Sequence, residues 1–78
     1  MPPRESINMT PFLIRTRTGA PARSIIIWAV ISESEIDARS AVAGVVAAGW
    51  TVEDVIGTAT PAIVKLLNLE PGKPERLA

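Results

Sequence analysis

The first regular pattern along the chain is a β-rich segment at residues 11–18. Within it, Ile14 and Thr16 alternate with Arg15 and Arg17, and a period of two is typical of a strand with one face in water. Because charged side chains commonly protect the edge of a sheet, we expect this segment to be an edge strand.

A more apolar segment follows a short connection. Residues 19–22 contain glycine and proline, which favour a turn. The run from Ile25 to Ile31 is apolar at every position, so apolar side chains project from both faces of the strand. The two segments together predict a β-hairpin, and the second segment is expected to be the central strand of the sheet.

The chemistry of a helix start appears just after this strand. The hydroxyl of Ser34 can accept a hydrogen bond from an unpaired backbone amide, and three acidic residues between positions 33 and 37 suit the positive end of a helix. Apolar residues continue at helical spacing to Ala48, and Gly49 is a typical stop. We therefore expect one main helix from about Ser34 to Gly49.

Residues 50–57 fit two structures. The spacing of Val52, Val55 and Ile56 matches a helix, whereas the β-branched content and the length suit a strand. A strand reached by a crossover from the main helix would lie parallel to the central strand and pair with its open edge, so we expect a strand. Thr60 followed by Pro61 then predicts the start of a short helix over residues 62–69.

These elements predict the α+β class. The expected fold is a small β-β-α-β-α domain over residues 11–70, with a three-stranded sheet, one main helix on one face and a short C-terminal helix. If residues 50–57 are helical, the alternative is a β-hairpin followed by three helices. Residues 1–10 are expected to form a disordered N-terminal tail, and residues 71–78 a polar C-terminal tail.

One face of the predicted sheet has little to cover it. We assign the odd-numbered residues between Ile25 and Ile31 to the face under the main helix. Ile26, Trp28 and Val30 then project to the other side, where only the short helix is available. The chain is also 47% hydrophobic with only 78 residues, although a small globule needs polar residues to cover its large surface. We therefore predict that Ile26, Trp28 and Val30 form the interface of a homodimer.

The residue types exclude several kinds of chemistry. Eight acidic and eight basic residues give no net charge, which disfavours long-range attraction to nucleic acid or to an anionic membrane. Cysteine and histidine are absent, which removes disulfides, the usual zinc ligand sets and the commonest general base. Glu53 and Asp54 are consecutive, so on a regular strand they would point to opposite faces and form no carboxylate pair. No catalytic residue, metal site or cofactor is predicted, and we expect a chain that is not an enzyme.

The expected location is the cytoplasm. The longest apolar run is far shorter than a bilayer requires, and residues 1–9 have no apolar signal core. The absence of cysteine agrees with a reducing compartment.

The leading hypothesis is a non-enzymatic protein-interaction or accessory module that acts as a homodimer and has a protein partner. The alternative is a nucleic-acid or phosphate-ligand site, in which Arg15, Arg17 and Arg23 bind phosphate beside the stacking ring of Trp28. Edge protection and core packing explain the same residues without a ligand. A third hypothesis is a ligand site formed between two subunits.

Overall fold

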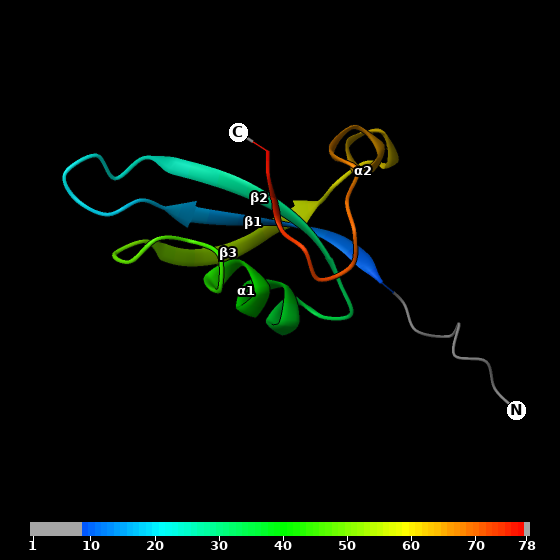
Figure 1. The fold of residues 1–78 in the computed structure, drawn as a ribbon, viewed down its shortest axis with the longest axis horizontal. Helices are drawn as coiled ribbons and strands as arrows, with labels where there is room; N and C mark the ends of the chain where they lie inside the picture. The colour runs from blue at the N-terminus through cyan, green and yellow to red at the C-terminus, as the bar shows by residue number, and fades with distance from the viewer. Residues whose placement is uncertain (1–8, 78) are drawn as a thin grey trace, which may run out of the picture.

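The computed structural model describes residues 9–77, which form one open sheet of four antiparallel strands and two helices (Figure 1). The strands lie in the order β3-β1-β2-β4, and the elements are β1 (Thr10–Arg17), β2 (Ile25–Ser32), α1 (Glu35–Ala43), β3 (Thr51–Thr58), α2 (Pro61–Leu67) and β4 (Glu75–Arg76). The α+β class is confirmed, with one strand more than the sequence predicts. Of the predicted N-terminal tail of residues 1–10, residues 1–8 lie outside the described residues. Thr10 is the first residue of β1.

The predicted β-hairpin is present. Strands β1 and β2 pair antiparallel from Thr10 opposite Ser32 to Arg17 opposite Ile25. The loop between them is closed by two hydrogen bonds of 2.8 Å: the Thr18 amide donates to the Ser24 carbonyl, and the Ser24 amide donates to the Thr18 hydroxyl.

Residues 51–58 form a strand, as expected, but β3 pairs antiparallel with β1 and not with β2. Strand β1 is therefore an interior strand, and the prediction that it lies at the edge is wrong. The physical reason is that the arginines of β1 face acidic residues of β3. We predicted from the sequence that these charges lie at a water-exposed edge, but they form ion pairs between the two strands.

The outer side of β2 is occupied by the C-terminal segment. Strand β4 pairs with Trp28 and Ala29. The amide of Gly72 donates to the Ile31 carbonyl at 2.8 Å, and the amide of Leu77 donates to the Ile27 carbonyl at 2.7 Å. The sequence predicts a polar tail over residues 71–78, of which position 78 lies outside the described residues. A turn after α2 lays residues 71–77 along β2, where backbone groups of this segment find partners.

Helix α1 begins as predicted and ends early. The Ser34 hydroxyl accepts a hydrogen bond from the Asp37 amide at 3.1 Å, and the last helical residue is Ala43. The following residues turn back towards the start of β3, so the helix cannot continue to position 48. Gly49 lies in this turn with φ +91°, a conformation that glycine adopts without steric cost.

The core lies between α1 and the sheet. Its fully buried apolar side chains are Ile14, Val30, Ala38 and Val42, and around them pack Phe12, Trp28, Ala41, Val46, Val52 and Val55. Residues directly opposite in an antiparallel pair share a face, so the pairing of Ile14 with Trp28 places the even-numbered residues of β2 under α1. The expectation that Ile26, Trp28 and Val30 point away from the main helix is therefore wrong. Because β2 is apolar on both faces, the register of the hairpin decides which face is covered.

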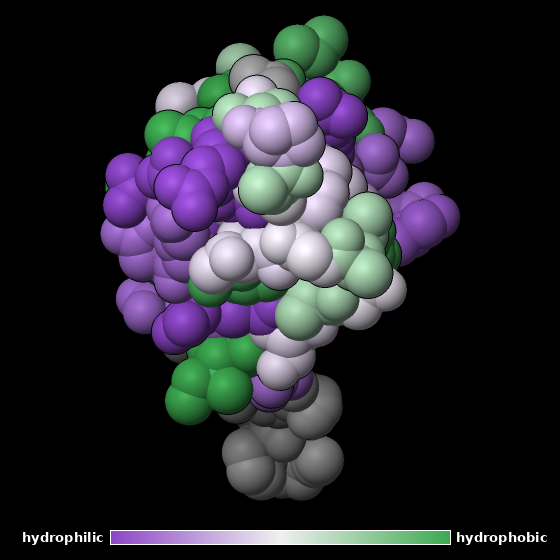
Figure 2. Space-filling model, turned by 90° about the vertical axis from the view of Figure 1, so that its left-hand side faces the viewer, coloured by the Kyte–Doolittle hydropathy of each residue, from purple (hydrophilic) through white to green (hydrophobic). Residues whose placement is uncertain are grey.

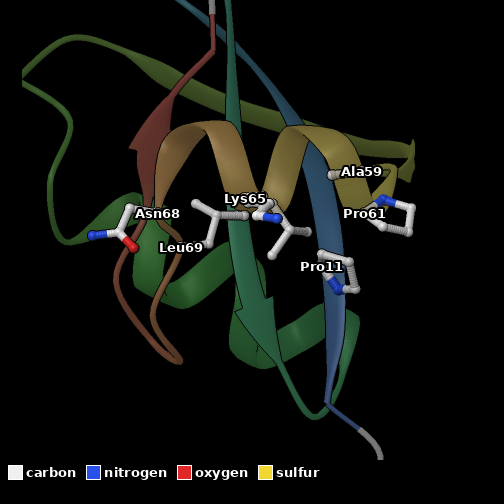
Figure 3. Close-up of a pocket in the computed structure, with 7 residues that line it drawn as sticks. Pro11, Ala59, Pro61, Lys65, Asn68 and Leu69 are labelled. Carbon is white, nitrogen blue, oxygen red and sulfur yellow. The ribbon is translucent and has the colours of Figure 1, made fainter.

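Helix α2 lies on the opposite side of the sheet from α1, as Figure 3 shows by the position of the strands between the two helices. It starts at the predicted place, where the Thr60 hydroxyl accepts from the Ile63 amide at 3.2 Å and Pro61 occupies the first turn. It ends at Asn68 in a left-handed conformation. None of its residues is buried, so α2 packs more loosely than α1.

Candidate interaction surface

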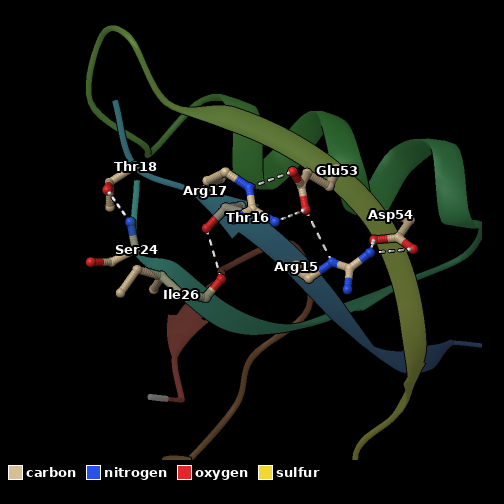
Figure 4. A network of polar contacts seen from close by, with 8 residues as sticks. All are labelled: Arg15, Thr16, Arg17, Thr18, Ser24, Ile26, Glu53 and Asp54. Carbon is tan, nitrogen blue, oxygen red and sulfur yellow. Dashed lines mark hydrogen bonds and ion pairs between the residues drawn. The ribbon is translucent and has the colours of Figure 1, made fainter. Parts of the chain in front are cut away.

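A charged cluster lies on the sheet face opposite α1 and joins β1 to β3 (Figure 4). Arg17 Nε donates to Glu53 Oε2 at 2.8 Å, and Arg17 Nη2 donates to Glu53 Oε1 at 3.4 Å. Arg15 Nη2 lies 3.0 Å from Asp54 Oδ1. Arg15 Nε lies 3.1 Å from Glu53 Oε1, which makes an ion pair without hydrogen-bond geometry. Two cations therefore meet two anions, and the cluster is balanced.

A bulge explains how both consecutive carboxylates reach one arginine. Ile14 pairs with Val55 and Thr16 pairs with Val52, so Glu53 and Asp54 together oppose the single residue Arg15. Such an extra residue re-aims side chains that a regular strand would send to opposite faces. The expectation that Glu53 and Asp54 diverge is corrected by this irregularity.

The cluster also perturbs protonation. The hydrogen bond from Arg17 lowers the pKa of Glu53, with smaller contributions from the positive charges of Arg17 and Arg15. The same hydrogen bond raises the pKa of Arg17. Both groups are ionised at neutral pH, and the guanidinium charges are already matched by carboxylates.

Trp28 does not lie beside the predicted basic residues. Its Nε1 donates to the Thr16 hydroxyl at 3.1 Å on the α1 side of the sheet, whereas Arg15 and Arg17 are on the other side. Arg23 lies in the exposed β1–β2 loop with φ 51°. The structure therefore does not assemble the composite phosphate site of arginines and tryptophan that the sequence suggested.

The three residues predicted to form an interface lie within the subunit. Ile26 is 8% exposed and Val30 is fully buried, while Trp28 is half-buried against the core. The exposed large apolar residues are instead Met9, Ile25, Ile36, Val45, Ile56 and Leu66.

One of these exposed residues stands beside the outermost strand. Ile36 is 75% exposed and lines a groove of about 310 Å³ between α1 and β3, together with Arg39, Ser40, Ala43 and Val52. We call this the α1–β3 groove. Strand β3 is the last strand of the sheet on that side, and among residues 9–77 no strand pairs with its outer edge. The sequence signal was the isoleucine between Glu35 and Asp37, which does not belong to the buried stripe of Ala38 and Val42.

Three further observations concern the surface, metal ligands and helices of the described chain. Figure 2 views the end that carries the β1–β2 loop, where hydrophobic residues are split into separate groups with hydrophilic residues between them. Within residues 9–77, no three side chains of the types that hold metals come together. Neither α1 nor α2 has the length and apolar character that a membrane-crossing helix needs.

Comparison of the chain with protein-family models, with curated proteins and with solved structures gives no match. The geometry of the α1–β3 groove, the open edge of β3 and the charged cluster is therefore the basis for assigning a function.

Proposed function

We propose that the chain is a non-enzymatic interaction module of the cytoplasm that acts as a homodimer, joined through the β3 edge and the α1–β3 groove of each copy. The observation that carries the proposal is the position of Ile36, which is 75% exposed and lines the groove next to a strand edge that no other strand of residues 9–77 pairs with. An exposed edge strand is a template for pairing with another chain.

The symmetry of the edge suits a second copy. Two β3 strands that pair antiparallel are related by a two-fold axis, which is the commonest symmetry of soluble oligomers. Each strand would supply hydrogen-bond partners for the outer backbone groups of the other. The result would be one continuous sheet with both α1 helices on the same face.

The side chains near the edge also suit this arrangement. With both α1 helices on one face, the two α1–β3 grooves would meet above the new strand pair. Ile36 and Ala43 of each copy would then leave water, and burial of apolar area stabilises association. The zero net charge of the chain gives no overall repulsion between copies. The arginines of β1 are already paired with Glu53 and Asp54, so their charge is balanced within each copy.

The test is sedimentation equilibrium of the full chain from about 1 to about 200 µM, the range in which moderate affinities are resolved. We expect a monomer–dimer equilibrium in the wild type and a dissociation constant raised at least about tenfold in Ile36→Lys, a loss of about 1.4 kcal/mol. Leu66→Lys is the matched control, because Leu66 is 80% exposed on α2, and its constant should equal that of the wild type.

Amide hydrogen exchange tests which edge is used. On dilution through the transition, exchange in β3 should accelerate more than exchange in β2, because only β3 loses its direct strand partner. A wild type that stays monomeric at the highest concentration would overturn the proposal. The assigned surface would be overturned if Ile36→Lys and Leu66→Lys gave the same dissociation constant. It would also be overturned if the changes in exchange were confined to strands other than β3.

A further inference from the structure

A second apolar cavity lies on the other side of the molecule, between α2 and the start of β1 (Figure 3). We call it the α2 cleft. Its volume is about 510 Å³, and its apolar walls come from Pro11, Ala59, Pro61, Val64 and Leu69. Small-molecule sites commonly enclose about 300–1,000 Å³ with mainly hydrophobic walls and a few polar groups. The α2 cleft therefore has the size and the lining of a ligand site.

The polar groups of the α2 cleft come from the C-terminal end of one helix. Lys65 lies in the last turn of α2, Asn68 follows as the C-terminal cap, and both line the cleft. Figure 3 shows the side chain of Lys65 extending from α2 between Leu69 and Pro61. The cleft is thus apolar in its body with one cation and one amide at its margin.

The ammonium group of Lys65 has no carboxylate partner in the described part of the chain. The ion pairs there are formed by Arg15, Arg17 and Lys73, and the last of these pairs with Glu70 at 3.8 Å. A single unmatched cation beside an apolar cleft is complementary to a single negative charge on an apolar body.

Helix α2 also has apolar area that burial would stabilise. None of its residues is buried, and Val64 in the helix and Leu69 just after it are only partly covered. A ligand that fills the space between α2 and Pro11 would remove these walls from water, which favours binding.

We propose that the α2 cleft binds a small amphipathic carboxylate. The hydrocarbon part would lie against the two prolines, Val64 and Leu69, and the carboxylate would accept a hydrogen bond from Lys65 Nζ. The side-chain amide of Asn68 can supply a further donor to the same group. This site is independent of the homodimer, because the α2 cleft and the α1–β3 groove lie on opposite faces of the sheet.

The experiment is an NMR titration of the ¹⁵N-labelled full chain with octanoate, and in parallel with octan-1-ol, which has the same chain length and no charge. We expect saturable shifts at Val64, Lys65 and Leu69, and binding of octanoate about tenfold tighter than of octan-1-ol, as a charge-assisted hydrogen bond predicts. In Lys65→Met the two probes should bind equally, because the apolar walls remain and the charge is gone.

Lys73→Met is the matched control and should keep the preference for octanoate. Continued binding of octan-1-ol by Lys65→Met shows that the cleft of this variant is intact. The proposal is overturned if octanoate gives no saturable shift at the cleft, or if Lys65→Met still prefers octanoate. The titration is repeated on Ile36→Lys, the variant that weakens the proposed dimer. An unchanged affinity for octanoate would show that the α2 cleft binds its ligand whether or not the chain dimerises.

Discussion

Replacing Thr16 by valine would remove a hydroxyl that links two strands inside the core. Thr16 is fully buried. Its hydroxyl donates to the Ile26 carbonyl at 2.8 Å and accepts from Trp28 Nε1 at 3.1 Å. Valine has nearly the same shape as threonine, so the substitution deletes two hydrogen bonds without opening a cavity.

The expected loss of stability follows from these two bonds. A neutral hydrogen bond contributes about 0.5–1.5 kcal/mol net, so Thr16→Val should lower the free energy of unfolding by about 1–3 kcal/mol. For a domain of this size, each kcal/mol lowers Tm by about 4–8 °C. With a loss of about 2 kcal/mol, we expect Tm to fall by roughly 8–16 °C.

Urea and thermal unfolding followed by circular dichroism measure this loss. All samples are held at one protein concentration, because self-association would couple stability to concentration. Thr18→Val is the control: its hydroxyl accepts from the Ser24 amide at 2.8 Å in an exposed loop, and exposed sites usually change stability by no more than about 0.5 kcal/mol.

A double-mutant cycle with Trp28→Phe isolates the bond between the hydroxyl and the indole. We expect a coupling energy of about 0.5–1.5 kcal/mol between positions 16 and 28. A Thr16→Val variant within about 0.5 kcal/mol of the wild type would show that the hydroxyl does not hold the strands together.

Three further results are expected from unfolding experiments. The pKa of Glu53 is lower in the folded chain than in the unfolded chain. Its ion pair therefore stabilises the fold fully above about pH 4.3, and this stabilisation is lost as the pH falls through the lower folded pKa. Glu53→Gln should reduce the drop in unfolding free energy between neutral and acid pH. Ile14→Ala in the core should cost about 2–5 kcal/mol, whereas Leu66→Ala on the surface of α2 should change urea unfolding by no more than about 0.5 kcal/mol. Ser34→Ala removes the helix cap and should lower the unfolding free energy by about 0.5–2 kcal/mol, with no loss contradicting the assigned cap.

Local chemistry predicted the starts of both helices correctly. Ser34 and Thr60 cap α1 and α2 because each hydroxyl accepts from an amide three residues further on, and this needs no knowledge of the rest of the fold. The hairpin and the strand after Gly49 were predictable for the same reason. Composition and periodicity act over a few residues, and these elements are decided at that scale.

The arrangement of the strands was not predictable in the same way. With Ile25 to Ile31 apolar throughout, neither face of β2 is marked as the buried one. The position of β3 beside β1 depends on contacts between residues almost forty positions apart. A signal for it does exist in the sequence: two arginines alternate on one predicted strand, and two acids stand on another. Taken together, these charges favour pairing of the two strands.

The fourth strand was missed because Glu75 and Arg76 carry no β pattern, and β4 exists only through the backbone of β2. Its position decides which edge of the sheet is open to another chain. The C-terminal segment covers β2 from Ile27 to Ile31, so within residues 9–77 the long free edge of the sheet is on β3. In the dimer that we propose, the β3 edges of the two copies would pair with each other, and growth would stop at a closed pair. Loss of the C-terminal segment would then expose β2, and each copy would have a second strand edge at which further copies could pair.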